Sequence, residues 1–234
     1  KWCLDEKVYG NNSYYCNNPV EMTYMGIMRG MRLIRLTVSP FEYNPVLNRL
    51  RIHNYISADV KISDVDRDKL IYNLRSTSTP YSTMVLRNVA NTKAYSNVLS
   101  SATDVPIKYV VVARDSFREA LQPFVQWKTR QGFDVVEYYP HYAANRDSIR
   151  AKLSDMYHGS TPLDPAPTFL LIVGDVEQIH SFIGRYTIPG GDAHATDLYY
   201  AEYTGDIYPE VLFGRMSVNN ISQLQAVINK TIEY

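Results

Sequence analysis

The strongest pattern in the chain is a run of six apolar or β-branched residues, Thr168 to Val173, with no alternation of polar positions. Pro167 precedes the run, and Gly174 and Asp175 follow it. Continuous runs of this length are typical of strands buried on both faces, which lie inside parallel sheets. The pattern therefore predicts a central strand, with Asp175 at its carboxyl end, where α/β sheets place their sites. The alternative role for Asp175 is a turn residue that closes the strand.

The second half of the chain alternates strand and helix patterns around this run. Stretches rich in β-branched residues are separated by stretches in which apolar residues recur with helical spacing. The predicted elements are strands at Tyr109–Ala113, Phe133–Tyr138, Asp197–Tyr203 and Glu210–Gly214, and helices that begin near Asp115, Asn145 and Asn220. Asn220 is the predicted N-cap of the last helix, with Gln223 at its third position. The β-α-β-α-β order predicts an α/β fold with a right-handed parallel sheet and flanking helices.

The first hundred residues have a different pattern. Apolar and polar residues alternate in Leu50–Tyr55 and again in Ala58–Ile62. Short alternating strands separated by turn residues predict a mainly antiparallel β domain. Residues 91–106 are rich in Asn, Ser, Ala and Thr, which is typical of a linker. We therefore predict two domains, a β domain with its linker at residues 1–100 and an α/β domain at residues 101–234.

Composition and charge exclude several classes of function. Lys and Arg together number 24, as do Asp and Glu, so the chain lacks the basic surplus of a nucleic-acid-binding protein. No apolar run approaches about eighteen residues, which predicts that the chain has no membrane span. The glycine-rich motifs of nucleotide-binding loops and the G-x-S-x-G elbow of serine hydrolases are also absent.

The two cysteines, Cys3 and Cys16, lie in a polar segment at the start of the chain. They are compatible with a disulfide, which is common in exported proteins, and equally with two free thiols. Neither lies near a pair of histidines, so no zinc site is predicted. A catalytic Cys–His pair needs both groups on one rigid scaffold, whereas His158-Gly159 ends a predicted helix. No catalytic residue is therefore assigned to this chain.

Two short acidic segments are the best candidates for chemistry. Asp175 and Glu177 follow the central strand, and Asp206 and Glu210 lie four residues apart around Tyr208-Pro209. Hard cations such as Ca²⁺ bind several oxygen ligands and combine carboxylates with backbone carbonyls. We expect such a site if the two segments meet at one end of the sheet. The alternative is that both are ordinary acidic turns.

Several motifs in order along residues 107–234 resemble the gingipain-type (C25) family of cysteine peptidases, nearest to its lysine-specific type. They are Tyr109-Val-Val-Val-Ala113, the segment from Phe117 to Phe133, Leu170-Leu-Ile-Val-Gly-Asp175, Asp197-Leu-Tyr-Tyr200, Gly205-Asp-Ile-Tyr-Pro-Glu210 and Phe213-Gly-Arg-Met-Ser217. Residues 29–62 are similar to the end of the family's propeptide, for example in Pro40-Phe-Glu-Tyr-Asn-Pro45. The resemblance implies a caspase-like α/β fold behind a propeptide. It also implies a secreted or cell-surface bacterial endopeptidase that acts on proteins or peptides.

The same resemblance implies bound Ca²⁺ as the cofactor. The residues that it assigns to the metal are Asp175, Glu177, Asp206, the carbonyl of Tyr208, and Glu210. Thr204 stands where the lysine-specific relatives have a further Asp, and Glu177 is expected to compensate for that missing carboxylate.

The catalytic Cys and His of the family follow the helix after Asn220, so the resemblance places both beyond Tyr234. The leading hypothesis is a propeptide end joined to the non-catalytic first subdomain of a secreted cysteine endopeptidase. Its substrates would be bound through the carboxyl-terminal subdomain. The alternative is a catalytically inactive surface-binding or protein-processing module with the same fold. A phospho-acceptor receiver that uses Asp175 is disfavoured, because the first strand of the α/β domain is followed by only one acid, Asp115.

Overall fold

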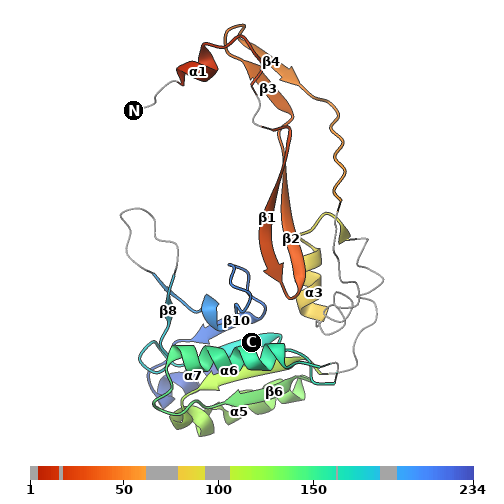
Figure 1. Cartoon of the computed structure of the whole chain (residues 1–234). Coiled ribbons are helices and arrows are strands. Elements are labelled where there is room, and N and C mark those ends of the chain that lie inside the picture. Colours follow the sequence, from red (N-terminus) through yellow and green to blue (C-terminus); the bar gives the residue numbers. More distant parts are fainter. Residues whose placement is uncertain (1–4, 16–17, 62–78, 93–105, 162, 185–193) are drawn as a thin grey trace. The chain divides into compact units, whose positions relative to one another are not determined.

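The computed structural model describes residues 5–15, 18–61, 79–92, 106–161, 163–184 and 194–234 (Figure 1). Cys3 and Cys16, and with them the question of a disulfide, lie outside the described residues. The chain forms two compact units. One consists of Lys1–Gly26 and Arg32–Val65, and the other of Ile27–Met31 and Asp66–Tyr234. A short turn early in the chain therefore belongs to the same unit as the carboxyl-terminal half.

Strands build the smaller unit, as predicted, and the ends of two of them at Ile27–Met31 belong to the larger unit. β1 (Val20–Met28) and β2 (Met31–Val38) form one two-stranded sheet, and β3 (Phe41–Asn44) pairs antiparallel with β4 (Arg49–Ile52) in another. A four-residue helix, α1 (Glu6–Tyr9), precedes them. The predicted strand at Ala58–Ile62 is wrong for the described residues 58–61, which have no regular structure and pair with no described strand.

The larger unit is organised around a four-stranded parallel sheet with the strand order β10-β7-β5-β6. Its strands are β5 (Lys108–Ala113), β6 (Asp134–Tyr138), β7 (Phe169–Val173) and β10 (Leu212–Met216). β7 is the apolar run that the sequence predicts to be central, and it pairs with β5 on one side and β10 on the other. Its residues after Phe169 are all buried, which is why the run contains no polar position.

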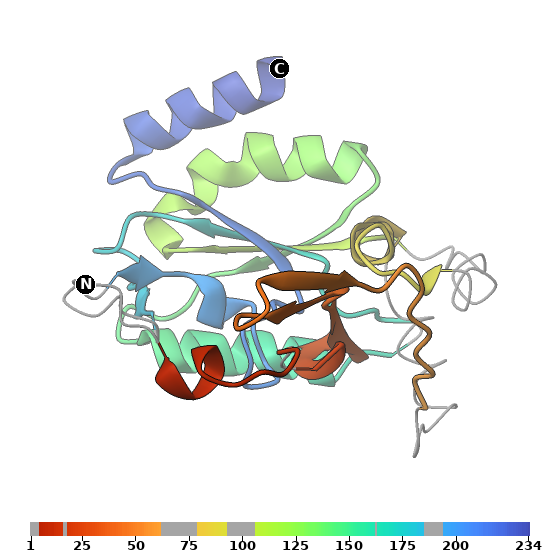
Figure 2. The ribbon, with the colours of Figure 1, turned by 90° about the horizontal axis from the view of Figure 1, so that it is seen from above.

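Helices cover both faces of this sheet (Figure 2). α5 (Arg118–Arg130) and α7 (Ile221–Glu233) lie on one face, and α6 (Arg146–His158) lies on the other. Successive strand residues alternate between the two cores. Val110 and Ile172 pack in the core that contains α6, whereas Val111 and Val173 pack in the core that contains α5 and α7. The predicted fold class, a parallel sheet with flanking helices behind a mainly antiparallel β segment, is confirmed.

Side-chain caps begin two of these helices where the sequence predicts them. The Asn145 carboxamide oxygen accepts from the Ser148 N–H at 2.8 Å, and that of Asn220 accepts from the Gln223 N–H at 3.0 Å. The other described elements are α3 (Thr79–Leu86), η2 (Asp115–Phe117), β8 (Phe182–Ile183), β9 (Ala195–Thr196) and η3 (Leu198–Tyr200). None of the described helices combines the length and the hydrophobicity that a membrane span requires.

The strand predicted at Asp197–Tyr203 is wrong. This segment contains η3, in which the Tyr200 N–H donates to the Asp197 carbonyl at 3.0 Å and closes a helical turn. Tyr200 and the following Ala201 are fully buried in the core that contains α6. Tertiary packing of these two residues overrides the β preference of the tyrosine-rich sequence.

Candidate functional site

The two acidic segments expected to form one site lie at opposite ends of the sheet. β10 runs parallel to β7 and pairs with it along the whole of Phe169–Val173. Glu210 precedes β10, whereas Asp175 follows β7, so more than the full strand length of about 13 Å separates them. The structure therefore does not bring Asp175 and Glu177 together with Asp206 and Glu210.

Asp175 closes the turn after β7. Its carboxylate accepts from the Val176 N–H at 2.8 Å and from the Ser217 hydroxyl at 3.0 Å. The hydrogen bond from Val176, followed by that from Ser217, lowers the pKa of Asp175. Gly174 has a φ of 119°, a backbone conformation that favours glycine, and the neighbouring Glu177 is exposed. These contacts are those of a turn residue.

The loop before β10 shares one hydroxyl between two carboxylates. The Thr204 oxygen lies 3.1 Å from Oδ2 of Asp206 and 3.1 Å from Oε1 of Glu210. A hydroxyl has one hydrogen to donate, so it satisfies only one of the two carboxylates at a time. Oδ2 of Asp206 also accepts from the Ile27 N–H at 2.7 Å, so Oε1 of Glu210 is the oxygen left without a donor when the hydroxyl turns to Asp206. The Tyr208 N–H donates to Oδ1 of Asp206 at 2.7 Å, which places Tyr208 in the same loop structure.

Glu210 is the most perturbed acid of this loop. Its side chain is fully buried, and Oε2 accepts from the Tyr203 N–H at 2.7 Å. Burial raises the pKa of Glu210 to about 7. The hydrogen bonds from Tyr203 and Thr204 lower the pKa, whereas the nearby charges of Glu202 and Asp206 raise it further. Near neutral pH this carboxyl group either holds a proton or needs a cation beside it.

Glu202 is a third carboxylate, outside the predicted set. It is fully buried, and Oε1 accepts from the N–H groups of Gly205 and Asp206, the latter at 3.1 Å. Among the described residues, Oε2 accepts no hydrogen bond and lies 3.7 Å from a guanidinium nitrogen of Arg150. The signal in the sequence is the spacing of four between Glu202, Asp206 and Glu210, which is hidden when Glu202 is assigned to a strand.

The oxygen ligands of this loop are of the kind that hard cations bind, although their present arrangement is not a formed metal site. In the part of the chain that the structure describes, no three His, Cys, Asp or Glu side chains form a ready metal site. The loop nevertheless offers only oxygen donors, and one of them, Oε2 of Glu202, is buried and without a hydrogen bond. Ca²⁺ binds such oxygen donors in flexible geometry. Of the predicted ligands, Asp206, Tyr208 and Glu210 therefore belong to one candidate site.

The opposite end of the sheet is held by a buried ion pair. Arg215 donates from two nitrogens to the two carboxylate oxygens of Asp197, each at 2.7 Å. A third nitrogen donates to the carbonyls of Gly174 and Ile179, at 2.7 and 3.0 Å. Both residues of the pair are mostly buried. This fork joins the motif Asp197-Leu-Tyr-Tyr200 to the motif Phe213-Gly-Arg-Met-Ser217.

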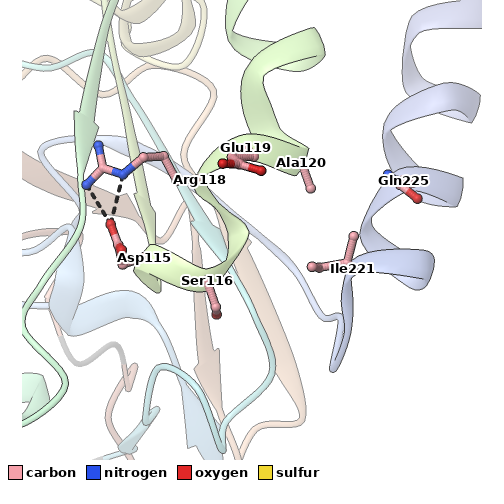
Figure 3. Close-up of a pocket in the computed structure, with 7 residues that line it drawn as sticks. All are labelled: Asp115, Ser116, Arg118, Glu119, Ala120, Ile221 and Gln225. Carbon is pink, nitrogen blue, oxygen red and sulfur yellow. Dashed lines mark hydrogen bonds and ion pairs between the residues drawn. The ribbon is translucent and has the colours of Figure 1, made fainter.

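An open pocket lies where α5 and α7 begin (Figure 3). It is lined by Asp115, Ser116, Arg118, Glu119, Ala120, Ile221 and Gln225. The Arg118 guanidinium is paired with the Asp115 carboxylate at 2.6 Å, so this acid is not free to activate Ser116. No His or Cys lines this pocket. His158 lies elsewhere, exposed at the end of α6 with its ring against Tyr157.

Comparison with known protein families identifies the family of this chain. A sequence model of peptidase family C25 matches residues 102–234, which is more than half of the chain. The chain belongs to peptidase family C25. A second family model, that of the C25 propeptide, matches residues 1–84. The C25 peptidase match therefore covers the whole parallel sheet, and the propeptide match covers β1 to β4.

Known C25 relatives match almost all of this chain. Lys-gingipain of Porphyromonas gingivalis is 29% identical over 229 residues, which are 97% of this chain and 13% of that protein. Gingipain R1 of the same organism is 24% identical over 231 residues, which are 97% of this chain and 22% of that protein. A solved structure described as "Structure of Protease" is similar with a TM-score of 0.50 and 32% identity, over 60% of this chain and 30% of that one. The chain thus spans less than a quarter of the curated relatives named here.

Proposed function

We propose that this chain is the propeptide end and the first α/β subdomain of a secreted or cell-surface, gingipain-like cysteine endopeptidase. The observation that carries the proposal is the order of the two family matches, a propeptide over residues 1–84 followed by a C25 peptidase over residues 102–234. The parallel sheet supplies the scaffold of the second segment. Protein or peptide substrates are the class that the family implies.

The catalytic groups of the proposed peptidase lie outside this chain. A cysteine peptidase needs a thiolate that an adjacent base activates. The two cysteines, Cys3 and Cys16, both fall in the propeptide match, and residues 102–234 contain none. We assign the nucleophile and its histidine to a further subdomain of the whole protein. The chain itself contributes the scaffold and the segment that precedes it.

The test compares this chain with the whole protein on fluorogenic peptides that carry Lys, Arg or a neutral residue before the scissile bond. We expect turnover by the whole protein that thiol-alkylating reagents abolish, and no turnover by residues 1–234 alone. Thiol-sensitive turnover by the chain alone would contradict the assignment of the catalytic pair. An inactive whole protein would instead favour the alternative, a surface-binding or protein-processing module with the same fold.

We also propose that Ca²⁺ is held in the loop before β10. The supporting observations are the buried Oε2 of Glu202, which accepts no hydrogen bond from the described residues, and the raised pKa of Glu210. A third is the single Thr204 hydroxyl that Asp206 and Glu210 share. When bound, the ion would neutralise these carboxylates and fix the start of β10. Asp175 and Glu177 are excluded from this set because they lie at the other end of the sheet.

A ligand that binds the folded chain raises its stability, so the calcium proposal is tested by thermal unfolding in excess Ca²⁺ and in chelator. We expect a higher midpoint in Ca²⁺, and a smaller difference for Asp206→Asn. Asp175→Asn is the matched control, and its Ca²⁺ response should equal that of the unmodified chain. Identical unfolding curves with and without Ca²⁺ would refute the proposal.

A further inference from the structure

The turn between β1 and β2 places a charged side chain inside the larger unit. Arg29 is only 3% exposed, although it lies at a turn, where charged side chains normally point into solvent. Its backbone is left-handed, with a φ of 49°, and Gly30 follows with a φ of 78°. Two-residue hairpin loops favour positive φ at both residues, because that backbone twist matches the twist of the flanking strands. This tight turn therefore places Arg29 at its first position, with the side chain directed inward.

The guanidinium of Arg29 is bound by backbone carbonyls. One nitrogen donates to Pro167 at 2.5 Å and to Glu210 at 2.9 Å, and the other donates to Ala166 at 3.0 Å. These oxygens come from the two segments that lead into β7 and β10, at the amino ends of neighbouring strands. A planar guanidinium reaches acceptors on both segments at once, whereas the point charge of a lysine does not have this geometry.

A second side chain from the same part of the sequence binds beside it. Tyr81, in α3, is fully buried, and its hydroxyl donates to the carbonyl of Pro209. Its ring lies 5.1 Å from the guanidinium carbon of Arg29, and the ring of Tyr157 lies 5.7 Å from it on α6. Both rings are within the range of cation–π attraction. We refer to the backbone oxygens of Ala166, Pro167, Pro209 and Glu210 as the carbonyl cluster.

The charges around Arg29 are also complementary. The Ile27 N–H donates to Oδ2 of Asp206 at 2.7 Å, so the turn is bound through its main chain as well. Burial lowers the pKa of Arg29, and the nearby Tyr157, Tyr81 and Glu210 side chains oppose this lowering because they favour the charged guanidinium. Arginine stays protonated in such surroundings. The surroundings of the carbonyl cluster therefore favour the charged guanidinium of Arg29.

We propose that the carbonyl cluster is a docking surface for the propeptide-matched segment, and that its central feature is a site for the guanidinium of Arg29. Both donors, Arg29 and Tyr81, belong to residues 1–84, and all four acceptors belong to residues 102–234. Hydrogen bonds from Arg29 and Tyr81 join the two segments independently of the chain between them, so the segments can remain associated after that chain is cut. Only the biological meaning of that cut rests on the proposed function.

The first test introduces a specific protease site between the two matched segments of the full chain, near residues 93–100. The folded chain is cut, and the association of the two parts is measured by dilution and size-exclusion chromatography. We expect the parts of the unmodified chain to stay together and Arg29→Ala to weaken their association about a hundred-fold, because several hydrogen bonds from a charged donor are lost. Arg29→Lys should be weakened nearly as much, and Tyr81→Phe less.

Arg35→Ala is the matched control, because Arg35 is an exposed arginine of β2. Its association should remain within about two-fold of the unmodified chain, as expected for a surface substitution. Equal association of the Arg29→Ala and Arg35→Ala chains would overturn the proposal. Peptidase activity is read in neither sample, so failure of the proposed peptidase function would leave this result intact.

Chemical rescue distinguishes recognition of a guanidinium from a general loss of folding. The uncut Arg29→Ala chain is melted with millimolar ethylguanidinium or with the same concentration of ethylammonium. We expect ethylguanidinium alone to raise the melting temperature of Arg29→Ala, and neither salt to raise that of the unmodified chain. Equal effects of the two salts on Arg29→Ala would refute a guanidinium site, even if this substitution prevents measurement on the cut chain.

Discussion

Replacement of Glu210 by Gln separates the two ways in which the loop before β10 can be neutralised, by a proton or by a cation. Burial raises the pKa of Glu210 from 4.5 to about 7. Each pKa unit corresponds to about 1.4 kcal/mol, and some relaxation of the loop reduces the total. With Glu210 protonated, the folded chain is therefore more stable by about 2–3 kcal/mol than with Glu210 ionised. Because the folded-state pKa is above that of the unfolded chain, this stabilisation is complete below about pH 4.5. It is lost as the pH rises through 7.

Glutamine is neutral at every pH, so Glu210→Gln lacks this loss. Its amide oxygen still accepts from the Tyr203 N–H, and its amide nitrogen donates towards the Thr204 hydroxyl, which then donates to Asp206. In chelator we expect the two chains to be nearly equal at pH 5. At pH 8 the variant should be more stable by about 2 kcal/mol. In excess Ca²⁺ the order should reverse, because the unmodified carboxylate binds the ion.

The measurement is urea unfolding at pH 5, 6, 7 and 8 in chelator, and again in Ca²⁺ at pH 8. Glu177→Gln serves as the control, because Glu177 is an exposed glutamate of the same unit. Subtracting its pH dependence removes the contribution of all other groups. Parallel stability curves for the unmodified chain and Glu210→Gln in chelator would refute the account of a destabilising buried carboxylate.

Three further substitutions test the scaffold by chemical denaturation. Asp197→Asn leaves the mostly buried Arg215 guanidinium without its counter-charge, and should lower the free energy of unfolding by about 3 kcal/mol; a loss below about 1 kcal/mol would show that the ion pair is energetically unimportant. Asn220→Ala removes the cap of α7 and should cost about 1 kcal/mol, whereas Asn220→Ser should cost little. Gly174→Ala should cost more than about 1 kcal/mol, because φ is 119° and the new Cβ would lie 2.8 Å from that of Gln178; an unchanged stability would contradict this turn geometry.

Local patterns in the sequence predicted an element correctly where the residues within that element determine its structure. The apolar run that became β7 and the cap at Asn220 follow from hydrophobicity and hydrogen bonding over a few residues. The strand predicted at Asp197–Tyr203 failed because Tyr200 is buried by distant parts of the chain. Periodicity does not contain that information.

The candidate site shows the same division. The sequence identified Asp206 and Glu210 as acids of interest, but grouped them with Asp175. In a parallel sheet, residues before one strand and after its neighbour lie at opposite ends, so the pairing of β7 with β10 separates these acids. The order of the elements along the chain is compatible with this separation, and the observed pairing of β10 with β7 establishes it.

By itself, the sequence determined the family, the parallel α/β scaffold, and the order of the strands and helices that build it. These depend on short-range preferences and on motifs that occur in a fixed order along the chain. Only the tertiary structure decided that Glu202 and Arg29 are buried. A charged residue in a turn or loop is usually solvated, and its burial becomes tolerable only when carbonyls and amides from remote segments satisfy it. That requirement is met in space, and the local sequence does not show it.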